Sequence, residues 1–268
     1  MANDRDTARE GAAVFLTSRL LPFRHGFATR AGGVSEGPYA SLNLGFAVGD
    51  ARERVEENFR RLAEAAGIPA SAFVTASQVH GDRVLRAAEP APGDLPGPPQ
   101  AEADALWTDR PAVAVGVKTA DCVPILIGDP DGGRVAAVHS GWRGTELRIV
   151  ARAVEVLAAA GSRPARLVAA IGPAIHPCCY EVSEELAERF ARALGEEVVA
   201  RAFPRPHLDL PAAVRRTLEQ SGVPTERIDV LPCCTACDGE RFFSHRRDRG
   251  VSGRHLSFVV GGAPLAIS

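Results

Sequence analysis

The chain has 268 residues, of which 46% are hydrophobic and 24% charged, and its formal net charge is −2. These values are typical of a globular protein with a large buried core, and they give no reason to expect nucleic-acid or membrane binding. No run of eighteen apolar residues occurs, and no signal peptide is recognisable. We therefore expect a cytoplasmic protein whose six cysteines are reduced thiols or metal ligands.

The N-terminal part of the chain predicts a tail, a glycine-bearing loop and one amphipathic helix. Residues 1–12 are polar and predict a flexible tail, so that 13–268 form a single domain. The loop Thr29–Ser35 contains a glycine pair, which can cradle an anion but more often only makes a turn. Asp50 predicts a helix N-cap in a capping-box pattern, and the apolar positions that follow at helical spacing end at Gly67.

A single histidine, His80, follows a short predicted strand at Ala72–Ala76 and precedes a glycine. A lone histidine in such a place is usually a packed loop or core residue, and only partners elsewhere in the chain would give it another role. Residues 89–100 hold five prolines and two glycines, so we expect an irregular surface loop there.

The centre of the chain predicts a β-hairpin. Two apolar runs, Val123–Gly128 and Arg134–Val138, flank the turn Asp129–Gly133, in which proline fixes φ while aspartate and glycine tolerate the bends. Cys122 stands just before the first strand and His139 just after the second. A register symmetric about the turn pairs these two residues at the open end, with their Cα atoms about 4.5–5.5 Å apart.

Three interpretations of Cys122 and His139 are open on the residues alone. They can be a buried thiol beside a structural histidine, or a Cys–His pair for nucleophilic catalysis. They can also belong to a zinc site of two histidines and one cysteine with an open fourth position, for which His80 is the candidate second histidine.

Arg143 lies in the segment Ser140–Thr145, which precedes a helical stripe from Leu147 to Ala158 that ends at Gly161. Backbone N–H groups at a helix N-terminus and a guanidinium beside them predict an anion site. The alternative is that Arg143 only pairs with a carboxylate.

The C-terminal half predicts a mixture of helices and strands and contains five of the six cysteines. Cys234 and Cys237 have C-x-x-C spacing, and Cys178 and Cys179 can join them in a structural zinc site. No second C-x-x-C exists, and Cys233 would crowd the turn, so we expect these cysteines to be buried free thiols that bind no metal. The predicted elements are strands at Leu167–Ile171, Ile228–Leu231 and Leu256–Val260, and helices at Ser183–Leu194 and Pro211–Ser221.

Several motifs together resemble those of the YfiH/YlmD family, also called laccase-domain or polyphenol oxidase proteins, peptidoglycan editing factors and, in animals, FAMIN. The resemblance spans roughly Phe27 to Val260 in order, and its motifs are the segments Thr29–Ser35, Ser41–Gly45, Gln78–Gly81, Thr119–Pro124, His139–Gly144 and Pro177–Glu181.

The resemblance implies an α+β fold, a single catalytic domain built as a layered αββα sandwich with mixed sheets. It implies a zinc-dependent purine nucleoside enzyme that catalyses phosphorolysis of adenosine, inosine, guanosine and methylthioadenosine and hydrolytic deamination of adenosine. The zinc ligands of the family map onto His80, Cys122 and His139. Our candidates for phosphate contacts are Arg30 and Arg143, and Asn43 and Gln78 are candidates for orienting the ribose or the base.

Other functions are compatible with the same residues. A Cys122–His139 hydrolase or a peptidoglycan-precursor editing factor is the main alternative. A copper polyphenol oxidase ranks low, because blue-copper sites usually add a methionine ligand and the only methionine is Met1. Copper bound in vitro would prove little, since Cu²⁺ outcompetes most divalent metals at such sites. We expect a purine nucleoside and phosphate as ligands, and a monomer or homodimer.

Overall fold

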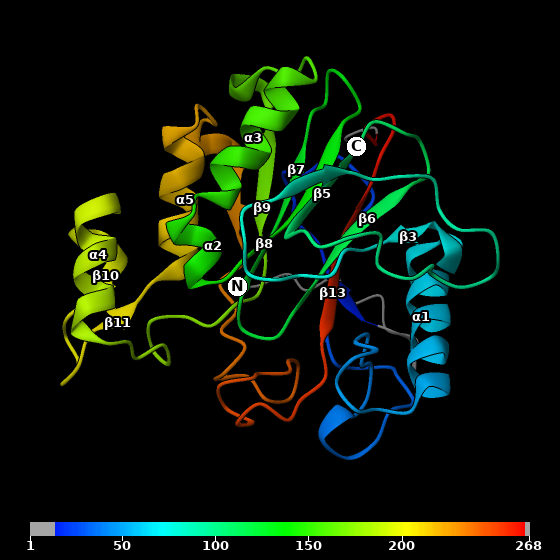
Figure 1. The fold of residues 1–268 in the computed structure, drawn as a ribbon, viewed down its shortest axis with the longest axis horizontal. Coiled ribbons are helices and arrows are strands. Elements are labelled where there is room, and N and C mark those ends of the chain that lie inside the picture. The colour runs from blue at the N-terminus through cyan, green and yellow to red at the C-terminus, as the bar shows by residue number, and fades with distance from the viewer. Residues whose placement is uncertain (1–13, 266–268) are drawn as a thin grey trace.

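Two β-sheets stacked face to face form the centre of the protein, and helices cover both outer faces (Figure 1). The computed structural model describes residues 14–265, and the predicted tail at 1–12 lies outside them. The layered αββα arrangement with mixed sheets confirms the predicted fold class.

The larger sheet has six strands in the order β12-β9-β7-β8-β5-β4. Its inner pairs are antiparallel, while the outer pairs β12/β9 and β4/β5 are parallel. The strands are β4 (Val84–Arg86), β5 (Ala105–Thr108), β7 (Val123–Gly128), β8 (Val135–Ser140), β9 (Val168–Ile171) and β12 (Ile228–Val230).

The second sheet has five strands in the order β1-β2-β13-β6-β3, and only its β3/β6 pair is parallel. A separate two-stranded ribbon joins β10 to β11. The strands are β1 (Phe15–Leu16), β2 (His25–Ala28), β3 (Phe73–Val74), β6 (Ala114–Thr119), β13 (His255–Val260), β10 (Val199–Ala200) and β11 (His207–Leu208).

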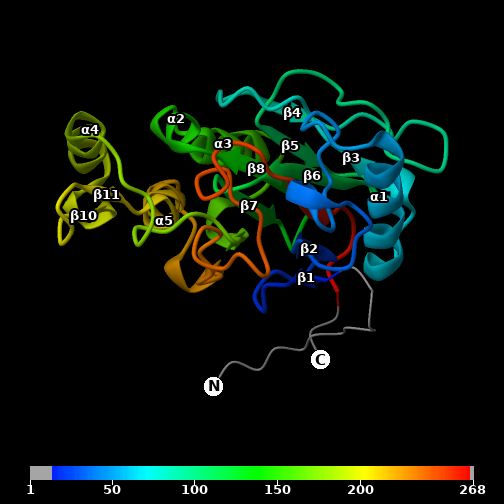
Figure 2. The ribbon, with the colours of Figure 1, turned by 90° about the horizontal axis from the view of Figure 1, so that it is seen from below.

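The helices divide between the two outer faces, as Figure 2 shows. One helix packs on the five-stranded sheet, and the others gather on the side of the six-stranded sheet. They are α1 (Arg52–Ala66) on the first side and α2 (Trp142–Glu146), α3 (Ile149–Ala159), α4 (Glu184–Leu194) and α5 (Leu210–Gln220) on the second.

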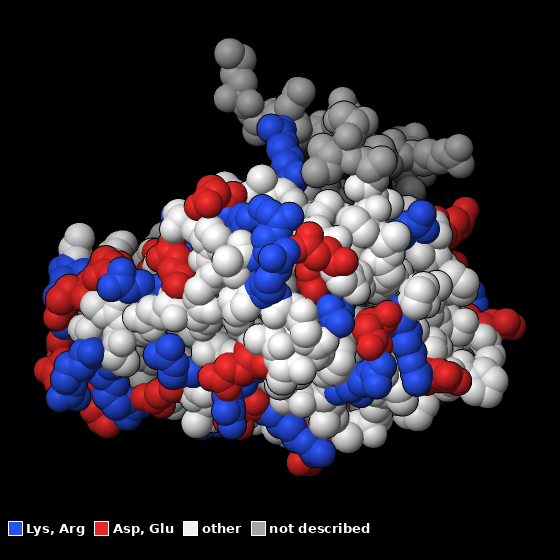
Figure 3. All heavy atoms as spheres, turned by 90° about the horizontal axis from the view of Figure 1, so that it is seen from above, with Lys and Arg blue, Asp and Glu red and all other residues white. Residues whose placement is uncertain are grey.

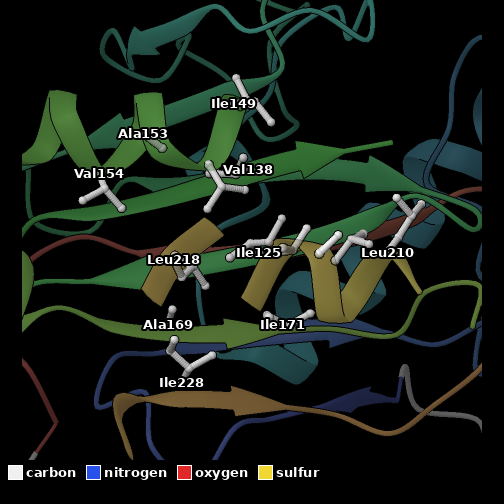
Figure 4. Close-up of a cluster of buried hydrophobic side chains, with 14 of the residues drawn as sticks. Ile125, Val138, Ile149, Ala153, Val154, Ala169, Ile171, Leu210, Leu218 and Ile228 are labelled. Atoms are coloured by element: carbon white, nitrogen blue, oxygen red, sulfur yellow. The ribbon is translucent and has the colours of Figure 1, made fainter. Parts of the chain in front are cut away.

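Alternation along β7 explains why its sequence is apolar at every position. Ile125 and Ile127 point to the helices α3 and α5, whereas Leu126 between them packs against the other sheet. The helix-side cluster is drawn in Figure 4. A strand buried on both faces reads as a continuous hydrophobic run, and this is how the hairpin was recognisable in the sequence.

The hairpin exists, but its predicted register was wrong. Val123 pairs with Ser140 and Gly128 with Val135, so His139 lies inside β8 opposite Pro124, and Cys122 is not its direct partner. The turn is asymmetric because Gly133 adopts φ 68° and donates its N–H to the Asp129 carbonyl (2.9 Å).

Two helix starts also differ from the prediction. The N-cap of α1 is Ala51, because the carboxylate of Asp50 instead accepts hydrogen bonds from Ser35 Oγ (2.6 Å) and Asn43 Nδ2 (2.9 Å). The helix predicted from Leu147 begins two residues later, as α3, because Arg148 adopts a left-handed φ of 60°; the short helix α2 ends before it at Glu146.

No helix among residues 14–265 is long and apolar enough to cross a membrane. On the face shown in Figure 3, basic and acidic side chains are intermixed and no continuous basic surface forms. This pattern agrees with the near-neutral net charge of the chain.

Candidate metal centre

The three residues His80, Cys122 and His139 meet at one end of the two sheets. His80 follows β3, Cys122 lies in the short connection from β6 to β7, and His139 is in β8. One donor atom from each lies within 4.8 Å of the others, and His80 Nε2 is 3.9 Å from Cys122 Sγ. The two imidazole rings are nearly perpendicular (77°) with centroids 4.9 Å apart, so both rings approach the same point as the thiol.

Asp104 lies beside the three candidate ligands and holds both histidines by hydrogen bonds. Its side chain is fully buried just before β5, and its Oδ1 atom accepts hydrogen bonds from His139 Nδ1 (2.8 Å) and the His80 N–H (2.9 Å). Its Oδ2 atom accepts from the N–H groups of Val79 (3.1 Å) and Gly81 (2.8 Å). One carboxylate therefore fixes both histidines, and it leaves Nε2 of His139 free to face the thiol.

Two residues at the centre have backbone conformations that residues other than glycine rarely adopt. His80 has φ 61°, and Asp121, next to Cys122, has φ 96°. Gly141 lies so close that a Cβ atom there would be 2.9 Å from Cys122 Sγ and 3.2 Å from a carbon of the His80 ring. Only glycine fits at this position without displacing a ligand.

Cys122 and His139 form a coupled pair. Burial alone would raise the pKa of Cys122, but the charge of His139 and hydrogen bonds from both histidines lower it to about 6. Burial would lower the pKa of His139, but the Cys122 thiolate and the Asp104 carboxylate raise it to about 9. The pair thus favours a thiolate, the form of cysteine that binds metals or attacks electrophiles.

The donor set fits a divalent zinc ion. Two imidazole nitrogens and one thiolate are the ligand types of catalytic zinc sites, which use three protein ligands and keep one position open. The carboxylate–histidine contact made by Asp104 is the usual outer support of such a ligand.

A cavity of about 710 Å³ opens directly beside the three ligands. Its lining combines aromatic rings (Phe46, Trp142, Tyr180), basic side chains (Lys118, Arg143, Arg246, Arg254) and one carboxylate, Asp121. Both oxygens of that carboxylate already accept hydrogen bonds, from Thr235 Oγ1 (2.7 Å) and the Arg246 N–H (2.6 Å). The cavity is therefore suited to a flat ring together with an anion.

Two of the predicted substrate-contact residues line this cavity. The amide of Gln78 is bonded to the backbone of Lys118, through Nε2 to the carbonyl (2.7 Å) and Oε1 to the N–H (2.8 Å), so it positions that lysine. Arg143 is exposed and stacks over Trp142 at 5.0 Å, and no carboxylate within residues 14–265 pairs with it. The helix predicted to present an N-terminus for anion binding is only the five-residue α2, which is too short to provide one. The guanidinium of Arg143 is therefore the part of the predicted anion site that the structure retains.

The other two, Arg30 and Asn43, lie outside the lining. Arg30 donates to the carbonyls of Ala40 (2.7 Å) and Gly239 (2.9 Å). Asn43 is fully buried, and its Oδ1 accepts the N–H groups of Gly45 (3.0 Å) and Arg254 (2.9 Å). Asn43 thus supports the cavity wall, because Gly45 and Arg254 line the cavity, whereas both carbonyls bonded to Arg30 lie outside the lining.

Sequence reasoning missed Asp104 and Lys118. The antiparallel pairing of β5 with β8 places Asp104 beside His139, but this pairing cannot be read from either segment alone. Lys118 lies in β6, a strand that the sequence analysis did not separate from the hairpin, and burial lowers the pKa of its ammonium group.

The C-terminal cysteines also differ from the prediction. Cys178, Cys179, Cys234 and Cys237 gather in one cluster, and Cys178 and Cys237 are exposed rather than buried.

Comparisons with known proteins agree with this architecture. A family model described as "Multi-copper polyphenol oxidoreductase laccase" matches residues 24–261. A purine nucleoside phosphorylase of Deinococcus radiodurans is 46% identical over 240 residues, which is 89% of each chain. Purine nucleoside phosphorylase YlmD of Geobacillus stearothermophilus is 39% identical over 247 residues, which is 87% of this chain and 88% of that protein.

Solved structures give the same result. The crystal structure of YlmD from Geobacillus stearothermophilus has a TM-score of 0.85 at 35% identity, and covers 96% of this chain and 98% of its own. That of the hypothetical protein YfiH from Bacillus licheniformis has a TM-score of 0.86 at 32% identity, with 97% and 100% covered. The chain therefore belongs to the laccase-like YfiH/YlmD family.

Proposed function

We propose that this protein is a zinc-dependent purine nucleoside phosphorylase acting on adenosine, inosine, guanosine and methylthioadenosine. The observation that carries the proposal is the shared cavity, in which aromatic and basic side chains adjoin the His80, Cys122 and His139 ligand set. The relatives named purine nucleoside phosphorylase support the same activity.

The cavity offers a place for each part of the reactants. Its volume of about 710 Å³ is in the range of small-ligand sites. The rings of Tyr180 and Trp142 provide faces on which a purine can stack. Burial raises the pKa of Tyr180 to about 12, so its phenol is neutral and can donate a hydrogen bond to the base.

Lys118 and Arg143 are the residues to which we assign phosphate. Both line the cavity, and no carboxylate in residues 14–265 is paired with either. Two cations beside the attacking phosphate reduce its charge repulsion and orient it toward the sugar carbon that loses the base. Zinc held by the three ligands would supply a Lewis acid at the cavity wall.

The test is turnover of adenosine with and without inorganic phosphate, with products separated by chromatography. Phosphorolysis gives adenine and ribose 1-phosphate only when phosphate is present. Arg143→Ala should reduce the phosphate-dependent rate by about tenfold to a hundredfold, because a hydrogen bond to a charged group contributes about 1.5–3 kcal/mol.

A matched control is Arg152→Ala, which removes an exposed arginine of α3 that does not line the cavity. This control should keep the wild-type rate, and Arg143→Ala should keep the wild-type zinc content. Adenine release that is independent of phosphate in the wild-type protein would contradict the proposal.

Adenosine deamination is a second candidate activity, because zinc nucleobase deaminases also use histidine and cysteine ligands. Those enzymes add a glutamate that transfers protons, whereas the cavity lining contains no glutamate and the Asp121 oxygens are occupied. We therefore rank deamination second. Since it requires no phosphate, Arg143→Ala should shift the products of adenosine from adenine toward inosine.

A metal-free Cys–His hydrolase is a further candidate, because Asp104, His139 and Cys122 form a hydrogen-bonded chain with an acidified thiol. Removal of metal by a chelator distinguishes the two, since the phosphorylase requires zinc and the thiol hydrolase does not. A copper oxidase receives no support from the ligand set, because no methionine within residues 14–265 is available as an axial ligand.

A further inference from the structure

Four cysteines form a second compact cluster that is separate from the candidate metal centre. The Sγ atoms of Cys178, Cys179, Cys234 and Cys237 all lie within 4.8 Å of one another. Cys237 Sγ is 3.3 Å from both Cys178 Sγ and Cys179 Sγ. None of the four lines the cavity, so the proposed phosphorylase chemistry gives this cluster no role.

The fold brings these residues together although 55 positions separate Cys179 from Cys234. Strands β9 and β12 are parallel neighbours, so the chain leaves both at the same edge of the sheet. The pairing continues past the strands, because the Ala174 N–H bonds to the Cys233 carbonyl (3.2 Å) and the Thr235 N–H to the Ala174 carbonyl (2.9 Å). A Cys-Cys pair on one segment thus faces a Cys-x-x-Cys turn on the other.

A backbone donor faces one sulfur of the cluster. The His176 N–H donates to Cys234 Sγ at 3.5 Å. An N–H group directed at a sulfur favours the thiolate, the form in which cysteine binds a metal.

The spacing of the four sulfur atoms fits one ion better than disulfides. A tetrahedral zinc with Zn–S bonds of about 2.3 Å separates its sulfurs by about 3.8 Å, which lies between the closest contacts and the outer limit of this cluster. Cys237 is equally close to two partners, whereas a disulfide would join it to only one.

We propose that Cys178, Cys179, Cys234 and Cys237 form a second metal site, which holds one zinc ion as four thiolates and has a structural role. Four protein ligands leave no open position for chemistry, as in structural zinc sites, and a tetrahedral all-sulfur set selects zinc or iron.

The position of the site indicates what the ion does. It joins the loop after β9 to the loop after β12, and both loops contribute to the cavity wall. Tyr180 follows Cys179 directly, and Arg246 of the second loop stacks over the Tyr180 ring at 5.0 Å and donates to the Glu181 carbonyl (3.2 Å). The ion therefore fixes two long loops that would otherwise be connected mainly by single hydrogen bonds.

Zinc content of the purified full chain tests the proposal, measured by elemental analysis under reducing conditions. Cys237→Ser should lose one zinc per chain relative to the wild type. Cys233→Ser is the matched control, because it removes the neighbouring half-buried thiol that does not belong to the cluster, and it should lose none.

Cobalt substitution provides a readout that needs no change in the cluster. In Cys122→Ser the first centre has lost its only sulfur ligand, so thiolate-to-cobalt charge-transfer absorption in the Co²⁺ protein should come from the cluster. This measurement remains decisive if Cys237→Ser does not fold.

Three results would overturn the proposal. The first is a zinc content of Cys237→Ser equal to that of Cys233→Ser. The second is a folded Cys122→Ser protein without thiolate-to-cobalt absorption. The third is disulfides among the four cysteines when peptides are mapped without reductant.

Discussion

Replacing Asp104 by asparagine should weaken both zinc binding and the stability of the fold. The carboxylate accepts four hydrogen bonds, two at each oxygen. An asparagine amide has one oxygen and one NH₂ group, so in either orientation two donors of the protein would face another donor. The fully buried position leaves no water to compensate for this loss.

The expected magnitudes follow from these contacts. Two lost hydrogen bonds to a charged group, at about 1.5–3 kcal/mol each, predict a loss of about 3–6 kcal/mol in the free energy of unfolding. Outer-shell partners of metal-bound histidines typically contribute about tenfold to a hundredfold in affinity, so zinc should bind Asp104→Asn more weakly by that factor. Urea unfolding of the metal-free protein and competition for zinc with a chromophoric chelator measure the two effects.

Asp129→Asn is the matched control, because Asp129 is also buried but lies at the other end of the β7–β8 hairpin. Its Oδ2 accepts from Ser162 Oγ (2.6 Å) and Arg134 Nη1 (3.1 Å). Six residues of strand, at about 3.3 Å each, place it about 20 Å from the centre. This variant should lose stability but keep its zinc affinity. If Asp104→Asn bound zinc as tightly as Asp129→Asn does, the assigned role of Asp104 would be wrong.

The pH dependence of stability gives an independent check on Asp104. Burial alone would raise the pKa of this carboxyl, but hydrogen bonds from His139 and the Gly81 and Val79 N–H groups bring it below its ordinary value. The carboxylate therefore stabilises the fold above the unfolded pKa of about 4, and this contribution is lost as the pH falls through the lower folded pKa. The difference in stability between wild type and Asp104→Asn should shrink in that acidic range, as urea titrations at several pH values would measure.

Two further outcomes follow from the centre. Gly141→Ala should lose most of its zinc, because its Cβ would lie 2.9 Å from Cys122 Sγ, whereas Gly81→Ala meets only ordinary contacts at 3.7 Å and should keep it; equal zinc contents would refute the steric argument. In the metal-free protein, alkylation of Cys122, followed by peptide mass spectrometry, should rise with pH through a midpoint near 6, and His139→Gln should move that midpoint toward the ordinary thiol value of about 8.5. An unchanged midpoint in His139→Gln would show that the histidine does not acidify the thiol.

Sequence patterns predicted those strands and helix ends that are determined by a few neighbouring residues. Apolar runs identified β7 and most of β8, and the Ser183 and Gly67 helix boundaries were found because capping is decided within a few residues. The hairpin register was missed because one glycine, Gly133, adopts a left-handed conformation that composition alone does not show.

Contacts that depend on the order of strands in a sheet could not be predicted from short sequence segments. The layered arrangement and the ligand set came from the family resemblance, not from periodicity. Asp104 reaches His139 only because β5 pairs with β8, and the four cysteines meet only because β9 and β12 are parallel neighbours. The incomplete C-x-x-C spacing along the chain therefore predicted buried free thiols, whereas the order of the strands brings the four cysteines into one cluster.

The connection from β6 to β7 has a consequence for how activity depends on the integrity of the whole protein. His80 follows a strand of one sheet, His139 belongs to the other, and Cys122 lies where the chain crosses between them. The three candidate ligands therefore come together only when the two sheets are packed against each other. A fragment of the chain that contains only one of the two sheets cannot form the complete ligand set. Activity that depends on this centre therefore requires both sheets.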